Sequence, residues 1–363
     1  MKFHKSCLVA TLALTASTAV MASEQVVNVY NWSDYIDPAA LVKFEKETGI
    51  KVNYDVYDTN EVLEAKLLAG GSGYDVVVPT ASFLERQVKS GVYAEIDRSK
   101  LSNYGNLDTV MTEKVSTHDP DNKHSVPYTW GTIGLGYNVD MVKVRLGDVP
   151  VDSWDLIFKP EIAAKLEDCG IGLLDSSSEV MAIALNYLGL DPNSEKKADL
   201  KKATALISAA RPHYKYFHSS KYISDLANGD ICVTLAYNGD VLQAQGTADE
   251  AGQGVKIAYT VPKEGAPVWF DLMAIPADAP HKAAAYKFIN FILRPEIGAS
   301  ISNTVFFAVP NKAATEIVAP AVRNNKAVYP SDETKAVLYS QQAHTAKFDR
   351  KLTRAWTNIK TGR

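Results

Sequence analysis

Four consecutive residues near the start of the chain, Trp32, Ser33, Asp34 and Tyr35, combine two aromatic rings, a hydroxyl and a carboxylate. Core strands alternate apolar and polar residues, and a helix start needs one capping side chain, so neither role requires this combination. Carboxylates pair with cations, and aromatic faces attract them. The chemistry that this tetrad could perform is therefore the binding of an organic cation.

Motifs for other chemistry are weak. The run GTIGLG, 131–136, has its glycines in the reverse of the dinucleotide-binding spacing and lacks the strand–turn–helix context. The run GGSGY, 70–74, lacks the second glycine of a nucleophile elbow. The seven histidines are scattered without metal-ligand spacing, and no base or nucleophile stands beside a carboxylate pair. We therefore expect no enzyme, no cofactor and no metal.

Alternating strands and helices must position the tetrad. The helix after the first strand is expected to start at Asp37 as N-cap, with Pro38 in its first turn and Gly49 at its end. The βαβ spacing is typical of a mostly parallel sheet that is covered on both faces. In the first part of the chain we predict strands at 24–32, 50–57 and 74–79 and helices at 37–49, 60–71 and 82–91. Leu41, Val42 and Phe44 are expected to form the buried stripe of helix 37–49.

The rest of the chain continues the α/β pattern after an extended, glycine-spaced aromatic run at 126–138. A length of 363 residues is enough for about two domains, so two α/β lobes are plausible. Here we predict strands at 230–237 and 269–276 and helices at 152–166, 178–189, 280–302, 333–341 and 353–362.

The N-terminus has the features of a secretory signal. Lys2 and Lys5 precede an apolar stretch that is too short to span a bilayer, and Val20 and Ala22 are small residues ahead of a cleavage point before Ser23. A membrane anchor is the alternative. Cleavage shifts the formal net charge from -4 to about -6, so nucleic acid is not an expected partner. We expect a soluble periplasmic protein.

The mature chain keeps two cysteines, Cys169 and Cys232. Two thiols in an exported protein favour one disulfide over two free buried cysteines.

Five segments in order closely resemble the periplasmic polyamine-binding proteins of Gram-negative ABC importers. They are NWSDYI at 31–36, GYDVVVP at 73–79, PYTWGTIGLGYN at 127–138, YFHSSKYISDLANGDICVTLAYNGDV at 216–241 and VPKEGAPVWFDLMAIPADA at 261–279. The resemblance covers essentially the whole mature chain. It implies a type II periplasmic binding protein, with two α/β lobes that close on a ligand by a hinge motion. The lobes implied are 23–131 plus about 255–307, and 132–254 plus about 308–363, after a signal peptide at 1–22.

The resemblance also implies a set of ligand-binding residues. Thr80 stands where many members have Ser, and Phe307 where others have Tyr, so a hydroxyl contact is lost at the second position. Cys169 and Cys232 fall where relatives form a disulfide. The expected ligand-binding residues are Trp32, Ser33, Asp34, Tyr35, Thr80, Glu179, Tyr237, Asp240, Trp269, Asp271 and Phe307, with Ser219 and Ser220 at the rim.

A polyamine carries an ammonium at each end of an aliphatic chain, and each ammonium needs a carboxylate when it leaves water. Trp269 favours spermidine, because putrescine receptors tend to have Phe there; putrescine, cadaverine and agmatine stay open. The expected partners are the polyamine and a membrane permease, and the protein is expected to be a monomer without membrane insertion. The alternative is a periplasmic polyamine sensor that reports to a membrane signalling protein.

Overall fold

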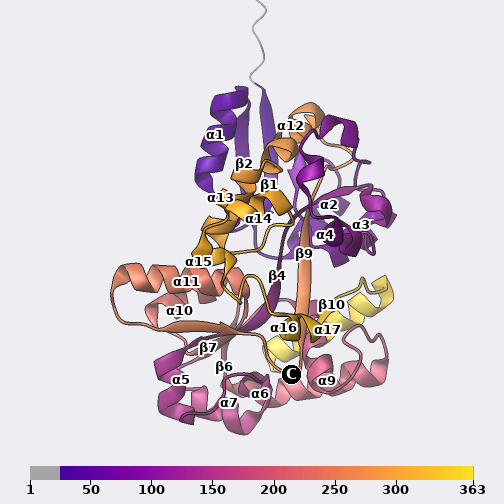
Figure 1. Cartoon of the computed structure of the whole chain (residues 1–363). Coiled ribbons are helices and arrows are strands. Elements are labelled where there is room, and N and C mark those ends of the chain that lie inside the picture. Colours follow the sequence, from indigo (N-terminus) through magenta and orange to yellow (C-terminus); the bar gives the residue numbers. More distant parts are fainter. Residues whose placement is uncertain (1–24, 363) are drawn as a thin grey trace, which may run out of the picture.

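The structure, a computed structural model, describes residues 25–362. Two lobes lie one above the other in Figure 1, and β4 (Ser125–Asn138) and β9 (Ala266–Ala274) run between them. The two strands pair antiparallel, from Ser125 opposite Ala274 to Thr132 opposite Val268, with an irregularity between Pro127 and Thr129. This arrangement confirms the predicted two-lobed α/β fold.

The upper lobe is built on three short strands that join the crossing pair. β1 (Val26–Trp32) pairs in parallel with β2 (Lys51–Tyr57) and with β3 (Val76–Val77), and β3 meets β9 antiparallel. The helices of this lobe are α1 (Pro38–Thr48), α2 (Asn60–Leu68), α3 (Ala81–Lys89), α4 (Thr109–Val115), α12 (Lys282–Ile292), α13 (Pro295–Val305), α14 (Lys312–Ile317) and α15 (Pro320–Arg323).

The lower lobe continues the sheet from the other half of β4. β7 (Val233–Tyr237) and β8 (Ile257–Thr260) pair antiparallel with β4, and β5 (Ile171–Leu173) pairs in parallel with β7 and with β6 (Tyr214–Phe217). The helices here are α5 (Val139–Leu146), α6 (Asp155–Phe158), α7 (Pro160–Leu166), α8 (Ser177–Tyr187), α9 (Lys197–Ala210), α10 (Tyr222–Asn228), α11 (Asn238–Ala251) and α17 (Ala346–Thr361).

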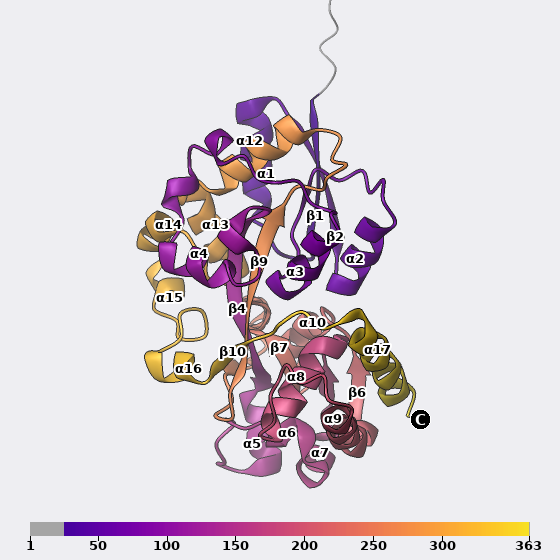
Figure 2. The same ribbon diagram turned by 90° about the vertical axis from the view of Figure 1, so that its right-hand side faces the viewer.

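Short elements complete the described chain. β10 (Leu338–Ser340) pairs in parallel with β9 near the lower lobe, and α16 (Asp332–Ala336) precedes it (Figure 2). Single 3₁₀ turns are formed by Arg98–Lys100, Tyr104–Asn106, Pro120–Asn122 and Arg211–His213.

The helix that follows the tetrad confirms the predicted end signals. The Asp37 side chain accepts a 2.9 Å hydrogen bond from the Ala39 N–H, and Gly49 ends α1 with a φ of 69°. The predicted buried stripe was partly wrong, because Val42 is 66% exposed. Ala40 and Phe44 are the buried residues of α1: they lie four positions apart on one face of the helix, and Val42 lies between them on the other side.

Three other predicted helices differ from the structure. The region 152–166 forms two helices, because Pro160 cannot continue α6 and instead starts α7. The region 280–302 forms two helices, because Pro295 cannot continue α12 and instead starts α13. The region 333–341 forms a short helix followed by the strand β10. The edge of β9 gives Leu338–Ser340 a pairing partner, and tertiary contacts of this kind override local helix propensity.

Cys169 and Cys232 form the predicted disulfide, with their Cα atoms 5.4 Å apart. Both residues are buried in the lower lobe, where Cys232 immediately precedes β7. Within residues 25–362, the helices are all too short or too polar to cross a membrane. The predicted signal peptide, 1–22, lies outside the described residues.

The predicted division of the chain between lobes, at about residues 131, 255 and 307, remains a prediction. Two contacts in the structure concern the chain just after residue 255 and just after residue 307. β8 pairs with β4 at Leu135–Asn138, in the lower part of the sheet, and α14 packs against α13 in the upper lobe.

Candidate ligand-binding site

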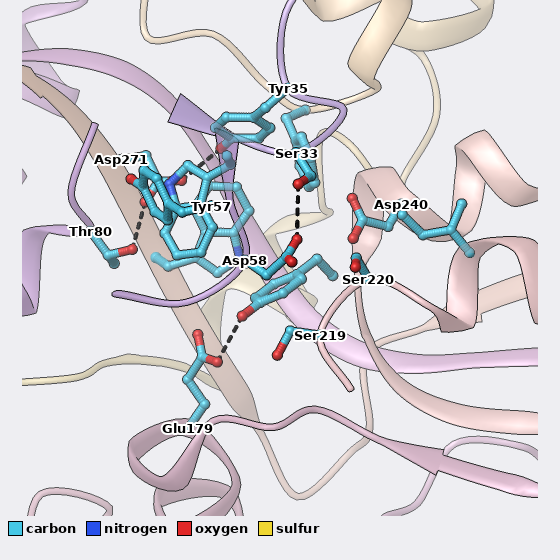
Figure 3. A pocket seen from close by; sticks show the side chains of 15 residues that line it. Ser33, Tyr35, Tyr57, Asp58, Thr80, Glu179, Ser219, Ser220, Asp240 and Asp271 are labelled. Carbon is cyan, nitrogen blue, oxygen red and sulfur yellow. Dashed lines mark hydrogen bonds between the residues drawn. The ribbon is translucent and has the colours of Figure 1, made fainter. Parts of the chain in front are cut away.

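A pocket lies between the lobes and is lined by side chains from both of them (Figure 3). Its empty volume is about 510 Å³, which includes the part open to solvent. The upper lobe contributes Trp32, Ser33, Tyr35, Tyr57, Asp58 and Thr80, the lower lobe contributes Glu179, Ser219, Ser220, Ile223, Tyr237 and Asp240, and Trp269, Asp271 and Phe307 come from β9 and the segment after α13.

The lining has an unusual charge balance. It contains four carboxylates, six aromatic rings and four hydroxyl-bearing Ser or Thr side chains, and none of the fifteen lining residues is Lys, Arg or His. Each carboxylate accepts a hydrogen bond from a Ser, Thr or Tyr hydroxyl. Hydroxyl groups orient a carboxylate but leave its charge in place, so the pocket is suited to a cation.

Asp271 is a buried strand residue of β9. The Thr80 hydroxyl donates a 2.7 Å hydrogen bond to Oδ1, and the Tyr35 phenol donates a 2.8 Å hydrogen bond to Oδ2. The pKa of Asp271 is raised to about 7, mainly by burial and in smaller part by the charge of Glu179. The two hydrogen bonds act in the opposite direction and lower it. Both oxygens are therefore held in place in a site that penalises their negative charge.

Glu179 lies in the first turn of α8, where the helix dipole favours an acid. The phenol of Tyr237 donates a 2.7 Å hydrogen bond to its Oε2. Burial raises the pKa of Glu179, and hydrogen bonds from Tyr237 and Ser176 oppose that rise. Glu179 and Asp271 lie on the same side of the pocket in Figure 3 and make one acidic end.

Asp240 occupies the opposite side of the pocket in Figure 3, in the first turn of α11. The phenol of Tyr222 donates a hydrogen bond to its Oδ2. Burial raises the pKa of Asp240 to about 7, and the charge of Asp34 also raises it. Asp58, which lies between the two sides in this view, accepts a 2.9 Å hydrogen bond from the Ser33 hydroxyl and is exposed.

Aromatic rings lie between the carboxylates. The Trp269 ring packs edge-on against Phe307 and Tyr237, with centroid distances of 5.0 and 6.1 Å. The Trp32 indole is fixed by a 2.9 Å hydrogen bond from Nε1 to the Val78 carbonyl, and its ring lies 4.6 Å from that of Tyr57. The Trp269 N–H is buried without a partner among the described residues. An ammonium has no lone pair with which to accept a hydrogen bond from this N–H. A cation is therefore attracted to the faces of these rings and not to the N–H edge of the indole.

Ten of the eleven residues expected to bind ligand line this one pocket, and Ser219 and Ser220 join them. The exception is Asp34, which is exposed and has a φ of 52°, in the left-handed region. Its effect on the pKa of Asp240 still shows that its charge acts on the pocket. The ligand-binding roles themselves stay predictions.

Sequence reasoning missed three lining residues, Tyr57, Asp58 and Ile223. A signal existed for the first two, because they stand at the carboxyl end of β2 just as Trp32 stands at that of β1. The strands are parallel and adjacent, so their carboxyl ends meet at one edge of the sheet, where ligands bind in open α/β folds. Ile223 lies within α10 and carried no such signal.

The sequence profile described as "Bacterial extracellular solute-binding protein" matches residues 39–330. The chain belongs to this family. Among similar proteins of this family, the chain is 53% identical over 361 residues to the putrescine-binding periplasmic protein PotF of Escherichia coli, covering 99% of this chain and 98% of that protein. It is also 53% identical over 364 residues to the putrescine-binding periplasmic protein SpuD of Pseudomonas aeruginosa, covering 100% of this chain and 99% of the relative.

Solved structures place this solute-binding protein in the same fold. One structure, from Listeria monocytogenes, has a TM-score of 0.84 and 32% identity and covers 93% of this chain and 100% of its own. The spermidine/putrescine ABC transporter substrate-binding protein PotD from Streptococcus pneumoniae has a TM-score of 0.75 and 29% identity and covers 93% and 99% of the two chains. The names of these relatives describe binding proteins, in agreement with the expectation that the chain is not an enzyme.

Proposed function

We propose that this solute-binding protein captures a linear polyamine, putrescine or spermidine, in the pocket between its lobes and delivers it to the permease of an ABC importer. The observation that carries the proposal is the pocket itself, which has carboxylates at two ends, aromatic rings between them and no basic residue in its lining. A molecule with a cation at each end and methylenes between them complements that arrangement.

In this proposal one ammonium binds Asp271 and Glu179, and the other binds Asp240. Asp34 adds negative charge at the Asp240 end, and Asp58 adds it between the two ends. Charge-assisted hydrogen bonds to the carboxylates offset the cost of removing each ammonium from water. The methylenes pack on the rings of Trp32, Tyr35, Tyr237, Trp269 and Phe307, and Ser33, Thr80, Ser219 and Ser220 supply further oxygen acceptors.

Two observations bear on the choice of polyamine. The relatives that are 53% identical are named as putrescine-binding proteins, and proteins named as spermidine/putrescine-binding are 35–36% identical. The expectation from Trp269 favours spermidine, because an indole at this position is typical of spermidine receptors. The proposal therefore includes both amines, and calorimetric titration will give their order of affinity.

The same comparison supports the cellular setting that we propose. The family is extracellular and the relatives named above are periplasmic, so we place this protein in the periplasm after cleavage near Ala22. We propose that it acts as a monomer whose partners are the polyamine and the permease, without nucleic acid or membrane insertion. The names of the reported relatives describe binding proteins and give no support to the sensor alternative.

The experiment that tests the function is calorimetric titration of the purified mature protein with putrescine, cadaverine, agmatine and spermidine. Sugars and amino acids with neutral or acidic side chains are the controls, because they lack two separated cationic ends. We expect binding of at least one of these amines and none of the controls. If no amine in the panel binds, the proposed function is wrong.

A further inference from the structure

An arginine next to the pocket joins the two lobes. Arg86 lies on α3 of the upper lobe, and its Nη1 is 2.8 Å from Oδ2 of Asp349 on α17 of the lower lobe. The two residues are 263 positions apart in the sequence. Their side chains are 23% and 28% exposed, so solvent screens this ion pair only in part.

Arg86 is held firmly on its own lobe. Its Nε donates a 2.6 Å hydrogen bond to Oε1 of Glu64 on α2, and its Nη2 donates a 2.6 Å hydrogen bond to Oε2 of the same carboxylate. This is the planar, two-bond geometry that suits a guanidinium group. The guanidinium also lies 4.0 Å from the ring centroid of Phe83. Nη1 is therefore aimed at the other lobe by contacts that do not depend on Asp349.

The helix that carries Asp349 is held on the lower lobe. α17 packs against α8 and α9, and Trp356 and Lys360 on the same helix both bond to Asp175 at 2.8 Å. The helix begins at Thr345, whose hydroxyl donates a 2.7 Å hydrogen bond to Glu195. The Arg86–Asp349 bond thus connects a side chain that is fixed on the upper lobe with a helix that is fixed on the lower lobe.

The ion pair lies at the edge of the ligand pocket. Arg86 lines a small cavity together with Ser82 of the upper lobe and Ser178 of the lower lobe, and Ser178 directly precedes the pocket residue Glu179. In Figure 2, α3 and α17 both lie to the right of the crossing strands β4 and β9. Rotation of the lobes about those strands would separate α3 from α17.

We propose that the Arg86–Asp349 ion pair is a latch that closes the pocket: it forms when the lobes close and must break before they part. This proposal rests on the proposed function, because it concerns how long the same pocket holds its ligand. Neither Arg86 nor Asp349 is among the residues that line the ligand pocket, so the latch acts on the closing equilibrium and not on recognition. It biases the protein toward the closed state whether or not ligand is bound.

The first test is the dissociation rate of bound polyamine from Asp349→Asn protein. We expect dissociation about threefold to tenfold faster than in the wild type, because a partly exposed pair contributes modestly. Asp349→Glu keeps the charge and should restore most of the lost residence time. The matched control is Asp168→Asn, which breaks the pair of Arg145 with Asp168, at 2.6 and 2.7 Å, inside the lower lobe. Its dissociation rate should equal that of the wild type.

The second test needs no ligand. Spin labels on Leu68→Cys of α2 and Lys202→Cys of α9 report the distance between the lobes, because both residues are exposed and the native cysteines are in a disulfide. In Asp349→Asn protein we expect a smaller closed fraction than in the wild type or in Asp168→Asn protein. Equal closed fractions and equal dissociation rates would overturn the latch. If no polyamine binds, the proposed function is wrong, but the distance measurement still tests whether the Arg86–Asp349 pair favours the closed state.

Discussion

The phenol of Tyr237 donates a 2.7 Å hydrogen bond to the carboxylate of Glu179 inside the pocket. One residue precedes α11 and the other lies in the first turn of α8, so two helix starts of the lower lobe meet at this bond. The bond lowers the pKa of Glu179 against the effect of burial and so favours the charged carboxylate that a cation needs.

Tyr237→Phe keeps the ring and removes this bond. The pKa of Glu179 should rise, and polyamine affinity near neutral pH should fall by about tenfold or more, because a hydrogen bond to a charged group contributes about 1.5–3 kcal/mol. Tyr339→Phe is the matched control, because the Tyr339 hydroxyl is buried and has no hydrogen-bond partner within residues 25–362. Titration calorimetry compares the two, and equal affinities would show that the Tyr237 hydroxyl has no part in binding.

Polyamine affinity should depend on pH through Asp240 and Asp271. Burial raises the pKa of each to about 7, so both are increasingly protonated below that pH and lose their attraction for ammonium. We expect affinity to increase from pH 6 to pH 8 at constant ionic strength. An affinity that is flat over this range would mean that neither carboxylate titrates in the free protein.

The same groups give the ligand-free protein the opposite trend in stability. A carboxyl whose folded pKa is about 7, against 3.8 for the ordinary group, binds its proton more tightly in the folded state. Its contribution to stability is complete below pH 3.8 and is lost as the pH rises to about 7. The melting temperature of Asp271→Asn protein should therefore change less than that of the wild type between pH 5 and pH 8.

Asp240→Asn tests the second end of the pocket. It removes one negative charge and should weaken putrescine binding by more than about tenfold, because an ammonium then leaves water without a carboxylate partner. Asp249→Asn on the same helix is the control, because Asp249 is exposed and lies outside the pocket lining. If Asp240→Asn protein binds as tightly as the control, this carboxylate is not an anchor.

The disulfide between Cys169 and Cys232 closes a loop of 63 residues. By the chain-entropy account, a loop of this length stabilises the folded state by about 4 kcal/mol. Urea unfolding should therefore shift to lower denaturant when a reductant is added. Cys169→Ala/Cys232→Ala protein should show the lower midpoint with no further change on reduction. A mass spectrum with two free thiols in exported protein would contradict the bond.

Local signals were enough to predict where much of the site lies. Trp32 is the last residue of β1, at the edge of the sheet where ligands bind. Asp37, Pro38 and Gly49 mark the ends of the next helix by their capping chemistry. Asp34 shows the limit of that reasoning. Consecutive residues in a turn cannot all face one cavity, and its left-handed backbone is not visible in the sequence pattern.

Features that depend on distant partners could not be predicted. Leu338–Ser340 becomes a strand because β9 offers an edge, and local propensity alone favoured a helix. Ile223 lies within α10 and enters the pocket only through the packing of that helix, so no local pattern marked it. The Arg86–Asp349 contact joins residues from opposite parts of the chain, which no local pattern connects.

The central claim is that two separated acidic ends bind two cationic ends of one ligand. The most direct test is the ratio of affinities for putrescine and for n-butylamine, which has the same carbon chain and one ammonium, measured by calorimetry at pH 8. We expect putrescine to bind at least about a hundredfold more tightly, since each further charge-assisted pair contributes about 1.5–3 kcal/mol and the unpaired carboxylates remain buried. Equal affinities for the two amines would contradict the account.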